Sequence, residues 1–398
     1  MHFLEICILF FRTFAAGFEN TYSMITRQLS ALLSGKTGRG KAIILIGARQ
    51  TGKTTLLKEL TANQPDVLWL NADDIAAQEL LHTLTIARLQ PLFGKYRTIV
   101  IDEAQRVADI GLRLKLITDN MPEVQLLVTG SSALELANRV NEPLTGRKYE
   151  YHLYPFSFHE LQFHHGMVEE IAQLPVRLVY GSYPEVVNTP GEAKVVLSQL
   201  ANSYLYKDVL EWERIKRPEK LLRLLQALAF QLASEVSYNE LSRLVGLDKD
   251  TVADYITLLE QAQVIFRIGS FSRNLRKELK TARKIYFYDN GIRNALIGNF
   301  ADVNMRADTG VLWENYLVSE RLKRNANLQQ QANMYFWRTV QQQEIDYIEE
   351  MDGQLHAFEF KWNAKKNPRL SKTFRDAYPD ATFSVITPDN YFSFLGCP

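Results

Sequence analysis

The residues best suited to chemistry lie in GARQTGKTTLL (47–57), which directly follows the apolar run AIILI (42–46). Gly47, Gly52, Lys53 and Thr54 fit the phosphate-loop pattern G-x-x-x-x-G-K-[ST] without a mismatch. Glycine permits the sharp turn from a strand into a helix, and the inward N–H groups at the helix start cradle an anion. The residues expected to hold ATP are Gly47, Ala48, Arg49, Gln50, Thr51, Gly52, Lys53, Thr54 and Thr55. We predict that Lys53 reaches the β- and γ-phosphates and that Thr54 ligates Mg²⁺.

A pair of carboxylates follows a second apolar run, in RTIVIDEAQ (97–105). Two adjacent carboxylates at the end of a buried strand are costly without a cation. We therefore expect Asp102 to complete the Mg²⁺ shell and Glu103 to polarise the attacking water as a general base. A solvated strand end is the alternative.

Hydroxyl groups end a third run, VQLLVTGSS (124–132), which carries Thr129, Ser131 and Ser132. We expect Ser131 or Ser132 to orient the attacking water, although Ser132 also suits the cap of a helix over ALELANRV. The runs VLWLNADD (67–74) and KYEYHLYP (148–155) complete a five-stranded parallel sheet that alternates with helices. This is the pattern of a doubly wound α/β domain, whose ligand lies at the carboxyl edge of the sheet.

Several motifs, in chain order, resemble those of bacterial and archaeal AAA-type ATPases that are fused to domain of unknown function 4143. They are GARQTGKTTLL, TIVIDEAQRV, LLVTGSSALEL, LTGRKYEYHLYPFSFHEL and GSYPEVV. The resemblance runs over nearly the whole chain and implies ATP binding and hydrolysis. Arg147, in LTGRKYEY, matches the arginine typical of that stretch. It either neutralises charge on the γ-phosphate, from the same or a neighbouring subunit, or forms a salt bridge at the end of the sheet.

The pattern divides the chain into an ATPase core (24–154), a helical lid or adaptor (155–217), a winged helix-turn-helix (218–285) and a nuclease-like α/β domain (286–398). His159, His164 and His165 form a cluster in the adaptor. It has no cysteine or carboxylate at ligand spacing, so we interpret it as structural. Residues 1–23 are interpreted as an upstream extension, because MITRQLSALLSG from Met24 suits a first amphipathic helix; a membrane anchor is the alternative.

The winged helix-turn-helix is predicted from an amphipathic helix over EKLLRLLQALAFQLAS, a second helix capped by Ser237 and Glu240 and ended by Gly246, a third helix, and a hairpin. Val252, Tyr255, Ile256 and Leu259 share the buried face of the third helix. Its exposed face carries the acidic residues Asp248, Asp250 and Asp254, which is unfavourable beside phosphates. The hairpin at 267–284 instead carries Arg267, Arg273, Arg276, Lys277, Lys280, Arg283 and Lys284. A basic wing that contacts DNA is predicted, with protein docking as the alternative.

A second set of carboxylates lies in the last third of the chain. Asp352-Gly353 predicts a two-residue hairpin turn, so the numbers of facing residues sum to 705. Asp346 then faces Glu359, and Glu344 faces Lys361, while Ile345, Tyr347, Phe358 and Phe360 share the other face. Facing carboxylates repel unless a divalent cation lies between them.

Together with Glu314 on a preceding helix, Asp346 and Glu359-Phe-Lys361 resemble the PD-(D/E)xK nuclease core. The resemblance implies that the carboxylates bind Mg²⁺ or Mn²⁺ and that Lys361 positions or activates water. A solvated sheet face on which Lys361 relieves the repulsion is the alternative.

The composition excludes several other classes of protein. A formal net charge of +1 leaves no general attraction for polyanions, so a nucleic-acid surface must be local. The two cysteines, Cys7 and Cys397, form no ligand cluster or disulfide framework, which favours a reducing, cytoplasmic location. No membrane partner is predicted. DNA, a protein partner and further copies of the chain are the partners that these features favour.

Overall fold

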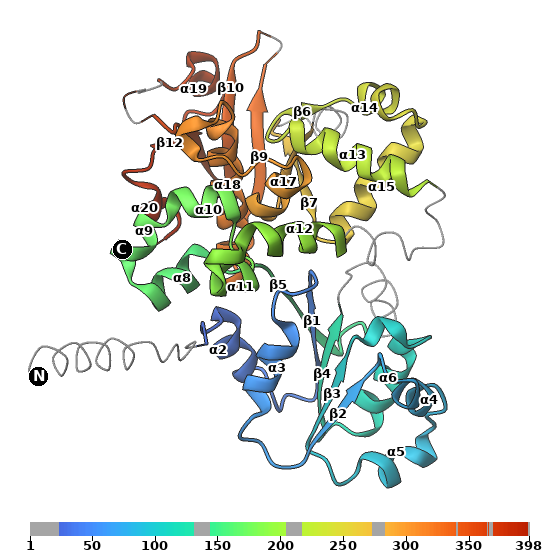
Figure 1. Cartoon of the computed structure of the whole chain (residues 1–398). Coiled ribbons are helices and arrows are strands. Elements are labelled where there is room, and N and C mark those ends of the chain that lie inside the picture. Colours follow the sequence, from blue (N-terminus) through green and yellow to red (C-terminus); the bar gives the residue numbers. More distant parts are fainter. Residues whose placement is uncertain are drawn as a thin grey trace, which may run out of the picture.

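The computed structural model describes residues 24–130, 144–203, 217–272, 283–339, 341–363, 365 and 369–396. The predicted extension at 1–23 therefore lies outside the described residues. Within them the strands form two sheets, each in its own body, and the helical adaptor lies between the sheets (Figure 1). No helix in this part of the chain is both long and apolar enough to cross a bilayer.

The first body is built on a fully parallel sheet. Its strands are β1 (Ala42–Gly47), β2 (Val67–Asn71), β3 (Thr98–Asp102), β4 (Gln125–Gly130) and β5 (Lys148–Leu153), in the order β2-β3-β4-β1-β5. Its helices are α2 (Gln28–Ser34), α3 (Lys53–Thr61), α4 (Ile75–His82), α5 (Ile86–Phe93) and α6 (Ile110–Asn120), with a 3₁₀ turn η1 (Ala104–Arg106). The predicted five-stranded parallel sheet is confirmed.

The central strands of this sheet are apolar along their length because both faces are covered. Ile44 and Ile46 of β1 pack with α4, α5 and α6 on one face. Ile43 and Leu45 pack with α2 and α3 on the other. Every residue of β1, β3 and β4 is buried, so these strands provide a rigid base for the loops at their ends.

The second body begins with the adaptor and contains all the later elements. The adaptor helices are α8 (Phe158–His165), α9 (Met167–Ala172), α10 (Leu174–Tyr180), α11 (Pro184–Asn188) and α12 (Ala193–Ser203), with η2 (Pro190–Glu192). The later helices are α13 (Pro218–Phe230), α14 (Tyr238–Val245), α15 (Lys249–Gln261), α17 (Asn290–Leu296), η4 (Val303–Met305), α18 (Thr309–Asn327), α19 (Lys372–Ala377) and α20 (Tyr391–Phe394). The strands are β6 (Glu235–Val236), β7 (Ile265–Ser270), β8 (Arg283–Phe287), β9 (Asn333–Arg338), β10 (Glu344–Met351), β11 (Gln354–Phe360) and β12 (Thr382–Ile386).

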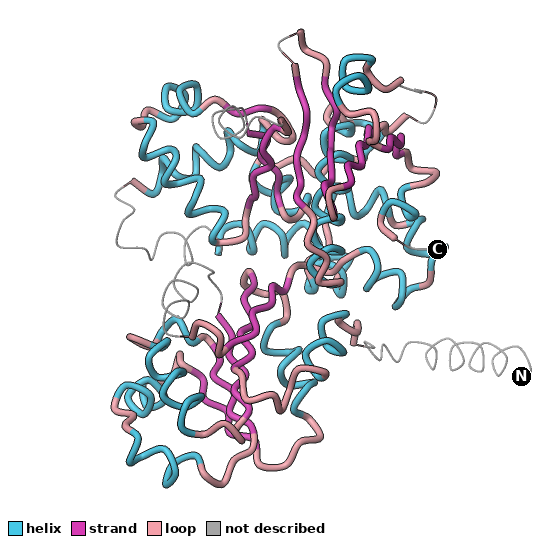
Figure 2. Tube along the Cα trace, turned by 180° about the vertical axis from the view of Figure 1, so that it is seen from behind, coloured by secondary structure: helices cyan, strands magenta, loops and turns pink. Residues whose placement is uncertain are grey.

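These seven strands form one mixed sheet in the order β12-β11-β10-β9-β7-β8-β6, seen from behind in Figure 2. The sheet continues across position 285/286, where the sequence analysis separates two domains. Gly269 and Ser270 of β7 pair in parallel with Tyr335 and Phe336 of β9, and so join the hairpin to the C-terminal strands. One hydrophobic core also extends from Phe158 in the adaptor to Leu395.

Helices α13, α14 and α15 form close to their predicted positions. Ser237 accepts a hydrogen bond from the Glu240 amide, and Gly246 ends α14 with a φ of 66°, in the left-handed region that favours glycine. The predicted apolar face of α15 is buried as expected. The basic hairpin differs from the prediction in part: Arg267 forms an ion pair with Glu260, and Lys284 is buried.

Of the other predicted wing residues, Arg283 is exposed. The remaining four, Arg273, Arg276, Lys277 and Lys280, lie outside the described residues.

Candidate functional site

The phosphate loop connects the end of β1 to the start of α3. A Cβ atom at Gly47 would lie 2.5 Å from the carbonyl oxygen of Leu153, so the loop passes too close to β5 for any side chain there. Gly52 has a φ of 93°, which L-residues with a side chain rarely adopt. Gly47 is therefore required for the close approach of the loop to β5, and Gly52 is required for a left-handed turn.

Lys53 is enclosed by the loop that it follows. Its Nζ atom donates to the carbonyl oxygens of Gly47 and Ala48, each at 2.8 Å, and the residue is only 5% exposed. Thr51 Oγ1 also donates to the Ala48 carbonyl at 2.8 Å. The ammonium group thus lies inside the anion cradle, where it can transfer its hydrogen bonds to phosphate oxygens.

The residues predicted to hold Mg²⁺ lie together. Thr54 Oγ1 donates to Asp102 Oδ2 at 2.8 Å, and Thr129 donates to the other carboxylate oxygen. A hydroxyl and a carboxylate are hard oxygen ligands, which suit Mg²⁺. Thr129, at the end of β4, thus contacts Asp102 directly, whereas the sequence analysis gave the polar role on this strand to Ser131 or Ser132.

Glu103 occupies a strained position in the lining of a cleft beside the phosphate loop. Its φ of 53° lies in the left-handed region, which is uncommon for a residue with a side chain and is concentrated at functional sites. Its amide donates to Thr129 Oγ1 at 3.2 Å, and its carboxylate accepts from Gln105 Nε2 at 2.5 Å. These contacts orient the carboxylate at the edge of the cleft.

The cleft has a volume of about 350 Å³ and contains two residues that the sequence analysis missed, Asp73 and Arg106. Arg106 Nε lies 3.4 Å from Asp73 Oδ1. Each residue follows shortly after a parallel strand, β2 or β3, so the rule that ligands bind at the carboxyl edge was a signal for both. The full lining is Arg49, Gln50, Gly52, Lys53, Thr54, Thr55, Asp73, Glu103 and Arg106.

Two predictions for this site, for the serines that follow β4 and for Arg147, are not confirmed by the structure. Ser131 and Ser132 lie outside the described residues. Arg147 immediately precedes β5, at the amino edge of the sheet, and forms an ion pair with Asp119. Because the phosphate loop lies at the opposite edge, Arg147 does not reach the nucleotide site of its own chain. The salt bridge at the end of the sheet is what the structure contains, and a contribution to a neighbouring subunit stays a prediction.

The hairpin of β10 and β11 has the predicted register, with Met351 opposite Gln354 and Tyr347 opposite Phe358. A β-bulge interrupts the pairing of β10 with β9 between Ile345 and Ile348. Bulges turn neighbouring side chains to new directions. Ile345 consequently packs in a different cluster from Tyr347, which corrects the prediction that these two residues share one face.

The carboxylates and the lysine of the C-terminal site lie near one another. Lys361 Nζ is 2.6 Å from Glu359 Oε2 and 3.4 Å from Asp346 Oδ2. The Phe360 amide also donates to Asp346 Oδ2 at 2.8 Å. The pairing of β10 with β11 ends at Tyr347 and Phe358, so the predicted pairs Asp346–Glu359 and Glu344–Lys361 are not ladder partners. Glu344 Oε1 instead lies 2.6 Å from Lys284 Nζ.

Lys284 and Tyr286, from β8, complete this cluster and were missed as site residues. Lys284 Nζ donates to Glu314 Oε1 at 3.0 Å, and the Tyr286 hydroxyl donates to the same oxygen at 2.7 Å. No local sequence signal identifies them, because β8 reaches the cluster only through the non-local pairing of β7 with β9. The hairpin and the predicted nuclease-like segment therefore share one site.

Burial and mutual repulsion change the acidity of this cluster. Burial, with the nearby charge of Asp346, raises the pKa of Glu314 to about 7, against the opposing effect of Lys284. Burial and Asp346 likewise raise the pKa of Glu359 to about 7, against Lys361. Glu314 and Glu359 therefore both change protonation state near neutral pH. In the described residues, no three His, Cys, Asp or Glu side chains lie close enough to hold a metal ion together.

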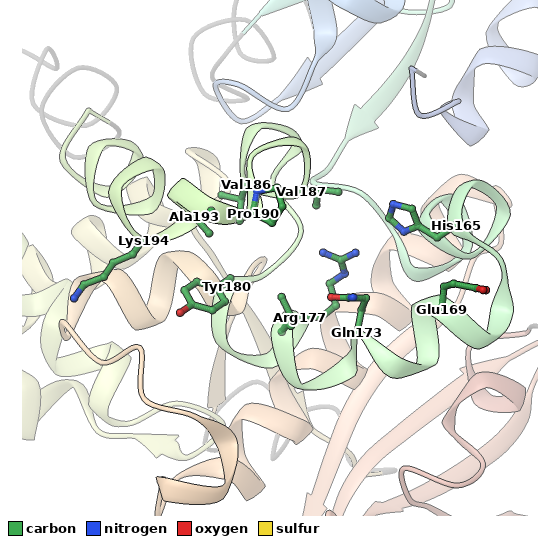
Figure 3. A pocket seen from close by; sticks show the side chains of 12 residues that line it. His165, Glu169, Gln173, Arg177, Tyr180, Val186, Val187, Pro190, Ala193 and Lys194 are labelled. Atoms are coloured by element: carbon green, nitrogen blue, oxygen red, sulfur yellow. The ribbon is translucent and has the colours of Figure 1, made fainter. Parts of the chain in front are cut away.

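A separate cavity of about 560 Å³ lies among the adaptor helices (Figure 3). Two of its lining side chains share one partner: Arg177 Nε lies 2.7 Å from Glu170 Oε1, and His165 Nδ1 lies 3.0 Å from Glu170 Oε2. His165, one of the three clustered histidines, therefore has a carboxylate partner in Glu170, which the sequence spacing did not indicate. Charges on the cavity wall are therefore partly balanced within the adaptor.

The fold and the cleft define a class of protein. A parallel sheet in the order β2-β3-β4-β1-β5, with a phosphate loop after β1 and Asp102-Glu103 after β3, is the core of a P-loop ATPase domain. In agreement, residues 39–162 match the family model described as an AAA domain, and residues 309–394 match domain of unknown function 4143. This chain thus joins an AAA-type ATPase domain to a 4143 region. Residues 171–303, between them, match domain of unknown function 8612.

The chain has relatives in bacteria and in an archaeon, Methanocaldococcus jannaschii. It is 25% identical over 384 residues to an uncharacterized protein of Mycobacterium tuberculosis, covering 92% of this chain and 80% of the relative. A relative from Haemophilus influenzae is 26% identical over 282 residues, covering 64% and 69% respectively. Among solved structures, the Walker-type ATPase of Pyrococcus abyssi is similar at a TM-score of 0.47 and 14% identity, covering 70% of this chain and 97% of that one.

Proposed function

We propose that this protein binds ATP with Mg²⁺, hydrolyses it, and couples hydrolysis to the binding of DNA or a partner protein by its second body. The observation that carries the proposal is the contact of Asp102 with Thr54, which lines the cleft together with Lys53 and Glu103. These are the groups that phosphoryl transfer to water requires.

Each residue of the cleft has a definable role in this proposal. Lys53 and the loop amides bind and orient the β- and γ-phosphates. Thr54 and Asp102 would hold Mg²⁺, which supplies charge neutralisation when bound. Glu103 accepts the proton of the attacking water, and the Thr129 hydroxyl positions Glu103 through its amide.

Replacing Lys53 with alanine should weaken ATP binding by about tenfold to a hundredfold, because hydrogen bonds from a charged donor contribute roughly 1.5–3 kcal/mol. The dissociation constant of a fluorescent ATP analogue, titrated with Mg²⁺ present, gives the measurement. Lys58→Ala is the control, since Lys58 is an exposed lysine of the same helix. Equal affinity in Lys53→Ala and Lys58→Ala would contradict ATP binding by this loop.

A nucleotide-switched binding module with slow turnover is the alternative within the same site. In that case the ATP-bound state only changes the pose of the second body, and hydrolysis resets it. Steady-state turnover of the wild type, with and without DNA, separates the two. Fast basal hydrolysis rejects the switch, whereas stimulation by DNA supports coupling.

The C-terminal cluster favours a second function, metal-dependent cleavage of nucleic acid. Asp346, Glu359 and Lys361 come together on the hairpin as the nuclease resemblance requires, and Glu314 lies on the adjacent α18. Asp346 and Glu359 would hold Mg²⁺ or Mn²⁺, which supplies Lewis acidity when bound. Lys361 would position the attacking water or the scissile phosphate.

If this second function is correct, Asp346→Asn should abolish metal-dependent DNA cleavage and leave ATP turnover within about twofold, because removing a charged ligand of a catalytic metal costs orders of magnitude in rate. Both activities are measured on the same preparation. Asp352→Asn is the control, because Asp352 is exposed at the turn of the same hairpin with a φ of 51°, which asparagine tolerates. Equal cleavage by both variants, or none by the wild type, would reject the nuclease.

A further inference from the structure

A single glutamine of the second body reaches into the phosphate loop. Gln263 Oε1 accepts a hydrogen bond from the Ala48 amide at 2.9 Å, although the two residues are 215 positions apart in the chain. Gln263 is 5% exposed and has a φ of 56°, in the left-handed region. A buried polar side chain on strained backbone indicates that the surrounding structure fixes this position.

Both backbone polar groups of Ala48, its amide and its carbonyl, form hydrogen bonds. Its carbonyl oxygen accepts from Lys53 Nζ and from Thr51 Oγ1, while its amide donates only to Gln263 among the contacts that the structure describes. Its methyl group belongs to the hydrophobic core of the second body rather than to either core of the ATPase sheet. The start of the phosphate loop is therefore packed into the second body.

The other end of the Gln263 side chain contacts the edge of the ATPase sheet. Gln263 Nε2 lies 2.7 Å from His152 Nδ1 on β5. The His152 ring stacks on Tyr154 with centroids 6.2 Å apart, and Tyr154 stacks on Tyr288 at 5.4 Å. Phe266 of β7 continues the series, with its centroid 4.9 Å from Tyr288. This contact orients the glutamine amide and connects it to the hairpin.

We propose that Gln263 is a positioning residue of the ATP site, supplied by the corner between α15 and β7, and that the affinity of the loop for ATP depends on the pose of that corner. The inference rests on the proposed ATPase function and names a residue through which the second body regulates it. Because the hairpin that begins at this corner is the element predicted to meet DNA or a partner, a ligand that shifts the hairpin alters ATP affinity, and ATP alters the affinity for that ligand by the same factor.

The test compares isosteric variants of the full-length protein. Gln263→Leu removes the acceptor for the Ala48 amide and should raise both the dissociation constant and the KM for ATP by about fivefold to thirtyfold, with little change in kcat. A residue that stabilises bound ATP equally in the ground state and in the transition state changes KM and leaves kcat unchanged. Gln263→Met also lacks a strong acceptor but is uncharged and of similar length, so it should raise KM by a similar factor.

Gln226→Leu is the matched control, because Gln226 is a half-buried glutamine of α13 whose side chain donates to the Leu296 carbonyl, away from the loop. Equal KM values in Gln263→Leu and Gln226→Leu would overturn the inference, as would a Gln263→Met variant with the KM of the wild type. If Gln263→Leu does not fold, His152→Phe replaces it, since it retains a ring beside Tyr154 and removes the contact to Gln263. An unchanged KM in His152→Phe then overturns the inference.

Failure of the inference and failure of the proposed function give different results. If the wild type binds no ATP, the proposed function itself is rejected. If the wild type binds ATP, Lys53→Ala binds it more weakly, and Gln263→Leu binds it as the wild type does, only the role of Gln263 is rejected.

Discussion

Glu103→Gln should lower the rate of ATP hydrolysis by at least about a hundredfold while ATP affinity stays within a few-fold of the wild type. The amide cannot accept the proton of the attacking water, but it fills the same space and retains an oxygen that can accept from Gln105. The substitution also leaves intact the hydrogen bond from the backbone amide of residue 103 to Thr129. The effect should therefore appear in kcat and not in binding.

Phosphate release by purified protein, with the dissociation constant measured on the same sample, tests this expectation. Glu79→Gln is the control, because Glu79 is an exposed glutamate of α4 in the same body. Turnover in Glu103→Gln equal to that of Glu79→Gln would remove Glu103 from the role of water activator. The cleft would then need another base among its lining residues.

Lys323→Met should destabilise the second body by about 3–5 kcal/mol, because it leaves a buried carboxylate without its charged partner. Lys323 is 1% exposed on α18, and its Nζ atom lies 2.6 Å from Glu320 Oε1. The same ammonium donates to the Phe156 carbonyl at 3.1 Å and to Ser182 Oγ at 3.2 Å. It thus connects α18 to the segments on both sides of the adaptor helices α8–α10.

Chemical denaturation, followed by far-UV circular dichroism, measures the loss. Lys249→Met, an exposed lysine at the start of α15, is the control and should change stability by less than about 0.5 kcal/mol. Adding Glu320→Gln to Lys323→Met should recover part of the loss, since the amide oxygen still accepts from the Phe158 amide and position 320 no longer carries a charge. A Lys323 variant as stable as Lys249→Met would contradict the expected cost.

The ATPase sheet was predictable because its information is local. All of its strands except β5 are short, mainly apolar runs, and the residues that do chemistry lie at or shortly after the strand ends, as Asp102 and Lys53 do. The direction of the strands also carried information that a motif match did not. Arg147 precedes β5, so in a parallel sheet it must lie at the edge opposite the phosphate loop.

The second body was less predictable because its decisive contacts are non-local. The hairpin register followed from the Asp352-Gly353 turn, but the bulge beside Asp346 depends on the pairing with β9. Lys284 was assigned to a solvent-facing wing, whereas the pairing of β7 with β9 brings it beside Glu314. No periodicity in the sequence specifies which distant strands become neighbours.

The strand order of the mixed sheet has a consequence for how the chain folds during its synthesis. The ATPase sheet ends with β5, at Leu153, so its pairings can form while the ribosome is still making the adaptor. In the mixed sheet, β7 has no partner on one edge until β9 has emerged, and β11 waits for β12 near the end of the chain. An unpaired strand edge is a template for association with other chains. We therefore expect the second body, rather than the ATPase sheet, to depend on a chaperone during synthesis. Shortening the gene from its 3′ end to remove β12 would leave one edge of β11 permanently unpaired.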